Sequence, residues 1–140
     1  MIQSLFRRQP PLLQPTQDQK IALQTLASRL PTLNWAAIGT DKGLAEAIYD
    51  PFSNEHPDRI ASMAAAILAL GERISSELHH GRMTHAIISG SKGIFLAHAI
   101  TPNHILVASL PAGTEIEPAL AALRDVAATL QDAGSSETHP

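Results

Sequence analysis

The chain has 140 residues, a formal net charge of −3 and an isoelectric point near 6.1, which fits one domain and gives no electrostatic footprint for nucleic acid. A hydrophobic content of 44% excludes wholesale disorder, and the absence of cysteine excludes disulfides, thiolate metal sites and cysteine nucleophiles. The longest apolar run, Met63 to Leu70, is far shorter than the roughly 20 residues of a membrane-spanning helix. We therefore expect a cytoplasmic protein without a membrane span.

The two ends of the chain differ in composition from the middle. Residues 1–15 include Pro10, Pro11 and Pro15 and show no periodicity, which predicts a flexible, proline-rich N-terminal arm. Residues 132–140 are small and polar, which predicts a disordered C-terminal tail. Residues 16–131, which lie between these two segments, are expected to form one domain.

The first helix is predicted to begin at Thr16, which forms a capping-box pattern with Gln19. Pro31 should end it, because proline disfavours helical conformation in the residue before it. Two β-prone runs follow, residues 34–39 and 44–49. The intervening Thr-Asp-Lys-Gly predicts a tight turn and hence a hairpin.

The middle helix is expected over residues 58–80, with Gly81 as its left-handed cap. Its large apolar residues recur at helical spacing and are expected to pack on the sheet: Ile60, Met63, Ile67, Leu70, Ile74 and Leu78.

Three strands are expected next, at residues 83–90, 93–100 and 104–110, and then a last helix from Thr114 with a second capping box to Glu117. These strands are apolar at both alternating sets of positions, so helices should cover both faces of the sheet. The predicted order is α-β-β-α-β-β-β-α. The fold class is α/β, more closely α+β, with a five-stranded antiparallel sheet between helices.

This order, from about Thr16 to Leu130, resembles the roadblock family, the dynein light-chain and MglB-like group of profilin-like domains. The resemblance is carried by IASMAAAILALGERISSEL, Gly81, AIISGSKGIFLAHAI and HILVASL. It implies a dimer through the middle helix and the following edge strand. It also implies a partner: bacterial relatives bind small Ras-like GTPases and one stimulates GTP hydrolysis, whereas eukaryotic relatives are subunits of motor and lysosomal scaffold complexes.

A helical wheel places Leu68 off the large apolar stripe, among small residues. This strip is the predicted dimer interface, together with part of the next strand: Ala61, Ala65, Leu68, Glu72, Ser75, His85 and Ile87. The alternative is that the chain's own N-terminal arm covers the strip, or that it is an ordinary alanine-rich surface.

The far side of the same helix is sparsely charged and is the predicted partner-binding face: Arg59, Ser62, Ala69, Arg73, Ser76 and His80. The alternative is a merely solvated face. Of the arginines, Arg59, Arg73 and Arg82 are placed to act near a bound nucleotide. The resemblance nevertheless implies stimulation through the GTPase's own residues and not through an arginine finger.

Enzyme motifs are absent from the sequence. There is no P-loop, and the glycines at positions 39 and 43 belong to a turn. If the turn at residues 91–92 has two residues, His85 faces His98, close enough to share a metal or to repel when protonated; a bulge at Gly93 would separate them. No Asp, Glu or Cys lies nearby in these strands as a further ligand, so we expect structural histidines, no metal and no cofactor.

The sequence thus predicts a non-catalytic homodimeric adaptor or regulator of a small Ras-like GTPase, acting by stimulating hydrolysis or by scaffolding. The alternative is a structural subunit, as homodimer or heterodimer, of a larger motor or signalling complex without effect on GTP turnover. A ligand-sensing module would require an internal pocket.

Overall fold

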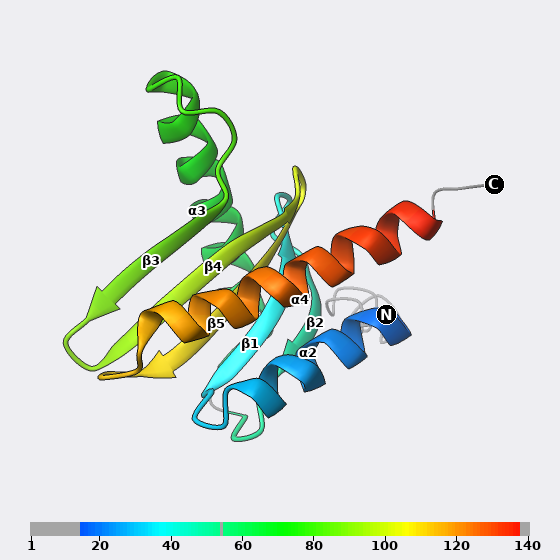
Figure 1. Cartoon of the computed structure of the whole chain (residues 1–140), viewed down its shortest axis with the longest axis vertical. Coiled ribbons are helices and arrows are strands. Elements are labelled where there is room, and N and C mark those ends of the chain that lie inside the picture. The colour runs from blue at the N-terminus through cyan, green and yellow to red at the C-terminus, as the bar shows by residue number, and fades with distance from the viewer. Residues whose placement is uncertain (1–14, 54, 138–140) are drawn as a thin grey trace, which may run out of the picture.

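The computed structural model describes residues 15–53 and 55–137. It contains a five-stranded antiparallel sheet in the order β2-β1-β5-β4-β3 and three helices (Figure 1). The elements along the chain are α2 (Gln17–Arg29), β1 (Trp35–Thr40), β2 (Ala45–Tyr49), α3 (Pro57–Glu77), β3 (His85–Gly90), β4 (Gly93–Thr101), β5 (His104–Pro111) and α4 (Ile116–Glu137). The predicted order and fold class are confirmed.

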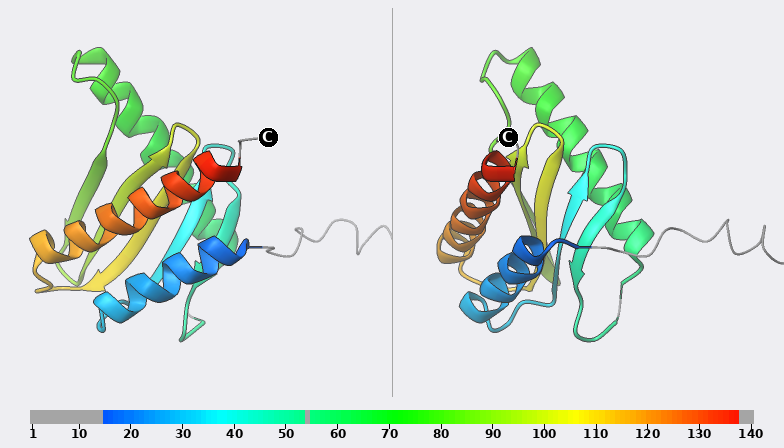
Figure 2. Two further views of the ribbon diagram at one scale, coloured as in Figure 1. Left: turned by 45° about the vertical axis from the view of Figure 1, so that its right-hand side comes forward. Right: turned by 90° about the vertical axis from the view of Figure 1, so that its right-hand side faces the viewer.

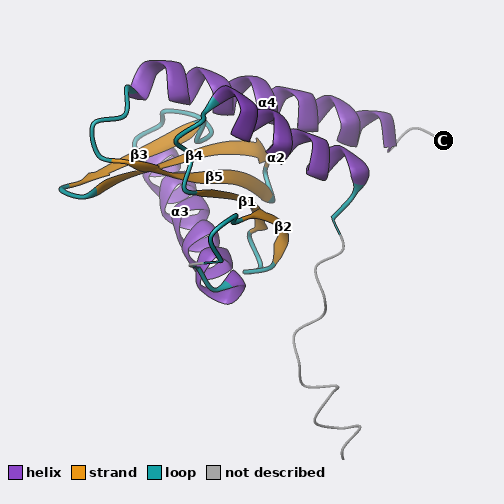
Figure 3. Ribbon diagram, turned by 90° about the horizontal axis from the view of Figure 1, so that it is seen from below, coloured by secondary structure: helices purple, strands orange, loops and turns teal. Residues whose placement is uncertain are grey.

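The sheet separates two layers of helices. Helices α2 and α4 lie side by side on one face, and α3 crosses the other face (Figures 2 and 3). The larger core lies under α2 and α4 and includes Leu26, Leu106 and Leu123, all fully buried. The smaller core, under α3, includes Trp35 and Leu68. Apolar residues on both sides of β5 account for this three-layer arrangement.

Helix α2 begins as predicted. The Thr16 side chain accepts the Gln19 amide, and the Gln19 side chain accepts the Thr16 amide, which completes the capping box. At its other end, Arg29 donates to Asp125 of α4 at 2.9 Å. This hydrogen bond lowers the pKa of the Asp125 carboxyl below its usual value.

The predicted boundaries of α4 need correction at both ends. The helix begins at Ile116, two residues after Thr114, and the Thr114 hydroxyl donates to the Pro111 carbonyl at 2.7 Å. The helix continues to Glu137, past the position where the sequence predicts a disordered tail. Residues 138–140 of that tail, and residues 1–14 of the N-terminal arm, lie outside the described residues.

The end of α3 also differs from the prediction. The helix stops at Glu77, and His79 adopts φ 58°, the left-handed conformation predicted for Gly81 as the cap. The amides of His79 and His80 bond back to the carbonyls of Ser76 and Ser75, which is the Schellman pattern. Gly81 has φ 84° and turns the chain beyond this cap.

The first hairpin forms as predicted, and its turn is stabilised by a hydrogen bond within it and by another from the β4–β5 turn. The Thr40 hydroxyl accepts the amide of Leu44 at 3.2 Å, and Gly43 takes φ 79°. Asp41 accepts the side-chain amide of Asn103 at 2.9 Å. The β1–β2 and β4–β5 turns are therefore linked at one end of the sheet.

The largest difference from the sequence concerns the rotation of α3. Its buried residues are Ile60, Ala61, Ala64 and Leu68, whereas the predicted core stripe contains side chains that are exposed: Met63, Leu70, Ile74 and Leu78. Small residues form the contact with the sheet: a Cβ added at Gly39 of β1 would stand 2.9 Å from the Ala64 Cβ. The helix therefore approaches the sheet closely at Ala64, buries Ile60 and Leu68 beside it, and leaves the four exposed residues of the predicted stripe in solvent.

Candidate interaction surface

The exposed side of α3 carries a row of large apolar side chains. We call Met63, Leu70, Ile74 and Leu78 the apolar ridge; their exposed fractions are 39%, 55%, 49% and 56%. Ile67 lies between them and is half-buried against the smaller core. The helix therefore presents apolar residues to the sheet and to solvent. Within residues 15–53 and 55–137, no other segment covers the four ridge side chains. A contiguous exposed apolar row of this kind is typical of an interaction site.

Strand β3 continues this surface at the edge of the sheet. It pairs with β4 on one side, and its other side is the sheet's edge. Ile88 is 50% exposed and pairs with Phe95, whose ring contacts Trp35 of the smaller core at a centroid distance of 6.3 Å. Ile88 and Phe95 therefore lie on the face that α3 crosses.

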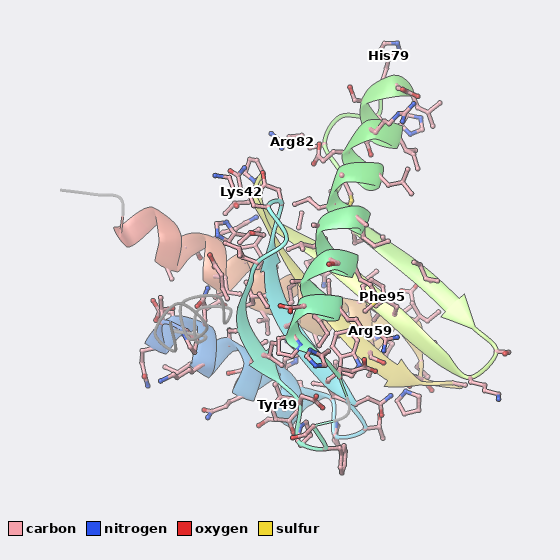
Figure 4. The ribbon with its side chains drawn as sticks, turned by 180° about the vertical axis from the view of Figure 1, so that it is seen from behind. Lys42, Tyr49, Arg59, His79, Arg82 and Phe95 are labelled. Carbon is pink, nitrogen blue, oxygen red and sulfur yellow. The ribbon has the colours of Figure 1, made fainter. Side chains whose placement is uncertain are left out.

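Helix α3 packs mainly on β1, β2 and β5 and leaves this face of β3 open. In Figure 4, Phe95 and Arg59 both lie on the side of α3 toward β3. We call the apolar ridge together with Ile88 and Phe95 the ridge surface. It comprises an apolar helix face and a strand edge that no other described strand pairs with, and both features favour contact with another protein chain.

The predicted dimer residues on α3 are not on the ridge surface. Ala61 and Leu68 are each 2% exposed and are packed under the helix. Ala65, Glu72 and Ser75 are half-buried, and Glu72 lies 3.6 Å from Arg82 as an ion pair. The prediction that Ala61 and Leu68 are exposed is therefore wrong, because the rotation of α3 turns them toward the sheet.

The predicted residues on the edge strand are exposed, but on the other face. Ile87 is 41% exposed and pairs with Leu96, which belongs to the core under α2 and α4. His85 pairs with His98 and lies on the same face as Ile87, because alternate residues of a strand share a face. Both are available at the sheet edge.

All six residues predicted to bind a partner are exposed, the first five on the outer side of α3 and the last just beyond its end: Arg59, Ser62, Ala69, Arg73, Ser76 and His80. Arg73 donates to Glu77 at 3.1 Å one turn later. Figure 4 shows His79 at the far tip of α3, beyond the sheet. This outer face is polar and sparsely charged, and it adjoins the apolar ridge.

A polar cluster lies on the face of the sheet that α2 and α4 cover, beside the start of α2. Glu46 accepts the Gln19 amide group at 2.9 Å and lies 3.3 Å from His104 Nε2. His104 Nδ1 is 2.9 Å from the Thr101 hydroxyl. These residues border an open hollow of about 210 Å³ with Ile38, Ile100 and Leu130 at its base. The Gln19–Glu46 hydrogen bond links α2 to β2, and the Glu46–His104 contact links β2 to β5.

Among residues 15–53 and 55–137, no group of three or more histidine and carboxylate side chains is placed to hold a metal ion. Within the same residues, no helix is long and apolar enough to cross a membrane.

A protein-family model described as the Roadblock/LC7 domain matches residues 22–109, which include α3, the edge strand and most of the sheet. The chain belongs to the Roadblock/LC7 family. Curated proteins give no match to the sequence.

Solved structures share this fold at low sequence identity. Myxococcus xanthus MglB matches with a TM-score of 0.77 and 12% identity, over 86% of this chain and 97% of MglB. A Roadblock/LC7 domain from Streptomyces avermitilis matches with a TM-score of 0.72 and 14% identity, over 82% of this chain and 96% of that one. Thermus thermophilus MglB gives 0.73 and 15%, over 91% and 98%. These likenesses establish the profilin-like roadblock fold.

The sequence could have revealed the rotation of this Roadblock/LC7 helix through one signal. Three positions on the inner side of this helix, residues 61, 64 and 71, are alanine or glycine. Ala61 and Ala64 are buried, and a Cβ added at Gly71 would collide with the Met83 side chain. A search for large apolar residues passes over such positions, whereas a search for small residues at helical spacing finds them.

Proposed function

We propose that this chain is a non-catalytic, cytoplasmic adaptor that forms a homodimer through the ridge surface. The observation that carries the proposal is the apolar ridge, four large side chains between 39% and 56% exposed along one helix. Pairing with the same surface of a second copy would remove this apolar area from water, at roughly 25 cal/mol per Å². A twofold dimer uses one self-complementary patch on both subunits.

The edge strand supports the same arrangement. The free backbone groups of β3 can pair with β3 of a second copy, which would extend the sheet across the dimer. Self-association also has a precedent in the fold, since one solved structure is described as MglB with a tetrameric arrangement and matches this chain with a TM-score of 0.73.

We further propose that the dimer binds a small Ras-like GTPase through the outer face of α3, with Arg59, Arg73 and His80 among the contacts. Those side chains are exposed, and they adjoin the ridge on which the two copies would meet. Two such faces would then lie side by side in the dimer. This part of the proposal extends the family resemblance to this chain.

The self-association step is tested by light scattering of the purified full chain. We expect a dimer mass for the wild type and a monomer mass for Leu70→Arg, because a charge within an apolar interface opposes its formation. Ile21→Arg is the matched control: Ile21 is also 50% exposed but lies on α2. A wild-type monomer, or a Leu70→Arg dimer as stable as the wild type, contradicts the proposal.

The GTPase step is tested with the small GTPases of the same genome. We expect one of them to co-elute with the dimer and to change its hydrolysis or exchange rate. Arg73→Glu should weaken this binding and leave the dimer mass unchanged. A stable partner other than a GTPase, without any effect on GTP turnover, would instead support a structural subunit of a larger complex.

A further inference from the structure

Two histidines face each other on the outer pair of strands. His85 is the first residue of β3 and pairs directly with His98 of β4, without a register shift between the strands. The two imidazole rings stack with centroids 6.1 Å apart and planes 19° from parallel. The predicted alternative of a bulge at Gly93 is excluded, because Gly93 pairs with Gly90 in the same register.

The hydrogen bonds of both rings involve Nδ1. His98 Nδ1 lies 2.9 Å from the Ala99 carbonyl oxygen; a carbonyl only accepts, so Nδ1 carries the proton and Nε2 carries the lone pair. His85 Nδ1 lies 3.0 Å from the Thr84 hydroxyl, which can accept in the same way. A histidine whose Nδ1 donates to a backbone carbonyl, with Nε2 unprotonated, is arranged as metal-binding histidines are.

We propose that His85 and His98 together bind one divalent transition-metal ion through their Nε2 atoms. Two imidazole nitrogens that bind one metal ion at about 2.0 Å, with a nitrogen–metal–nitrogen angle near 90°, lie about 3 Å from each other. Facing residues of two strands have Cβ atoms about 5 Å apart. His85 is exposed, so its ring can leave the Thr84 hydroxyl and turn its Nε2 toward that of His98, which keeps its bond to the Ala99 carbonyl. Among the described residues no third ligand joins the pair, so water completes the coordination.

The chemistry of the pair fixes the class of ion. Imidazole nitrogen suits Cu²⁺, Ni²⁺ and Zn²⁺, and their affinities should follow the Irving–Williams order with Cu²⁺ tightest. Mg²⁺ and Ca²⁺ prefer oxygen ligands and should not compete. The bound ion would link β3 to β4 and so stabilise the edge strand.

This site does not depend on the proposed dimer. His98 pairs with Leu106 of the core under α2 and α4, so the two histidines lie on the opposite face of the sheet from the ridge surface. The metal and dimer experiments can therefore fail separately.

The test is calorimetric titration of the full chain with CuCl₂, NiCl₂, ZnCl₂ and MgCl₂. We expect binding of the first three. His85→Gln and His98→Gln should each weaken Cu²⁺ binding about tenfold or more, since even loss of an outer-shell partner costs about 10–100-fold. The double variant should be little worse than either single variant, because both residues belong to one site.

His79→Gln and His80→Gln are the matched controls, because these two exposed histidines lie at the end of α3. They should leave the Cu²⁺ affinity unchanged. Metal-free thermal unfolding of every variant verifies that each is folded. A wild type that binds none of the three ions, equal affinity in all variants, or loss of affinity with only one of the two strand histidines overturns the proposal.

Discussion

The two faces of the sheet are covered unequally. Helices α2 and α4 lie side by side over one face, and α3 alone crosses the other. Five strands spaced about 4.8 Å apart span roughly 19 Å, whereas a helix with its side chains is about 10 Å wide. One helix therefore covers about half of a face that two helices cover fully.

This difference determines where apolar surface remains. Under α2 and α4, Leu26, Leu106 and Leu123 are fully buried. On the other face, Ile88 of the edge strand and the apolar ridge of α3 are both exposed. The half-covered face is thus the one with capacity for a second chain, and the following predictions test that contrast.

The largest expected effect separates two neighbouring leucines of α3. Leu68→Ala should lower the free energy of unfolding by about 2–5 kcal/mol, because it leaves a cavity in the smaller core. Leu70→Ala should change it by less than about 0.5 kcal/mol at protein concentrations too low for self-association. Urea unfolding measures both. Equal losses of unfolding free energy in the two variants would contradict the orientation of α3 described above.

Close packing of α3 on β1 predicts the next effect. Gly39→Ala would put a Cβ 2.9 Å from that of Ala64 and should cost about 1–3 kcal/mol of stability. Ala64→Gly should recover part of this loss, although alone it costs about 1 kcal/mol as a helix-interior glycine. Gly134→Ala, where an added Cβ has nothing within 4 Å, is the control and should not destabilise. Additive effects at Gly39 and Ala64 would contradict the close contact.

The end of α3 offers a smaller, stabilising change. His79 has φ 58°, which is costly for a residue with a Cβ, so His79→Gly should raise the free energy of unfolding by about 0.5–1 kcal/mol. Thermal unfolding measures the gain. His80→Gly has no such strain to relieve, and an equal gain there would argue against the assigned cap.

The smallest expected effect on stability concerns the ion pair between α2 and α4, the two helices that cover the other face of the sheet. Arg29 lowers the pKa of Asp125 from its ordinary 3.8, so between the folded and unfolded pKa values the unfolded chain binds more protons. The resulting stabilisation is present above about pH 3.8 and is lost as pH falls through the folded-state value. Asp125→Asn should be slightly less stable than the wild type at pH 7 and equal to it below this range.

Asp132→Asn on the same helix serves as the control for this pH series. Denaturant unfolding between pH 2 and pH 7 measures the difference at each point. A difference between wild type and Asp125→Asn that stays constant with pH would show that the ion pair does not couple to folding.

Local signals in the sequence account for most of the fold. The capping box at Thr16 and the turn before Gly43 are interactions between near neighbours along the chain. Such interactions act before any tertiary contact forms, which is why the element order and the antiparallel sheet could be predicted. The facing of His85 and His98 also follows from a two-residue turn alone.

The rotation of α3 was decided by the tertiary structure. Both sides of this helix are apolar, so its sequence permits two orientations on the sheet. Gly39 and Ala64 allow the closer approach, and this close packing buries Leu68 and leaves Leu70 outside. The sequence by itself determined that the helix has more apolar surface than one sheet face can take, whereas only three-dimensional packing determined which part of it remains in contact with solvent.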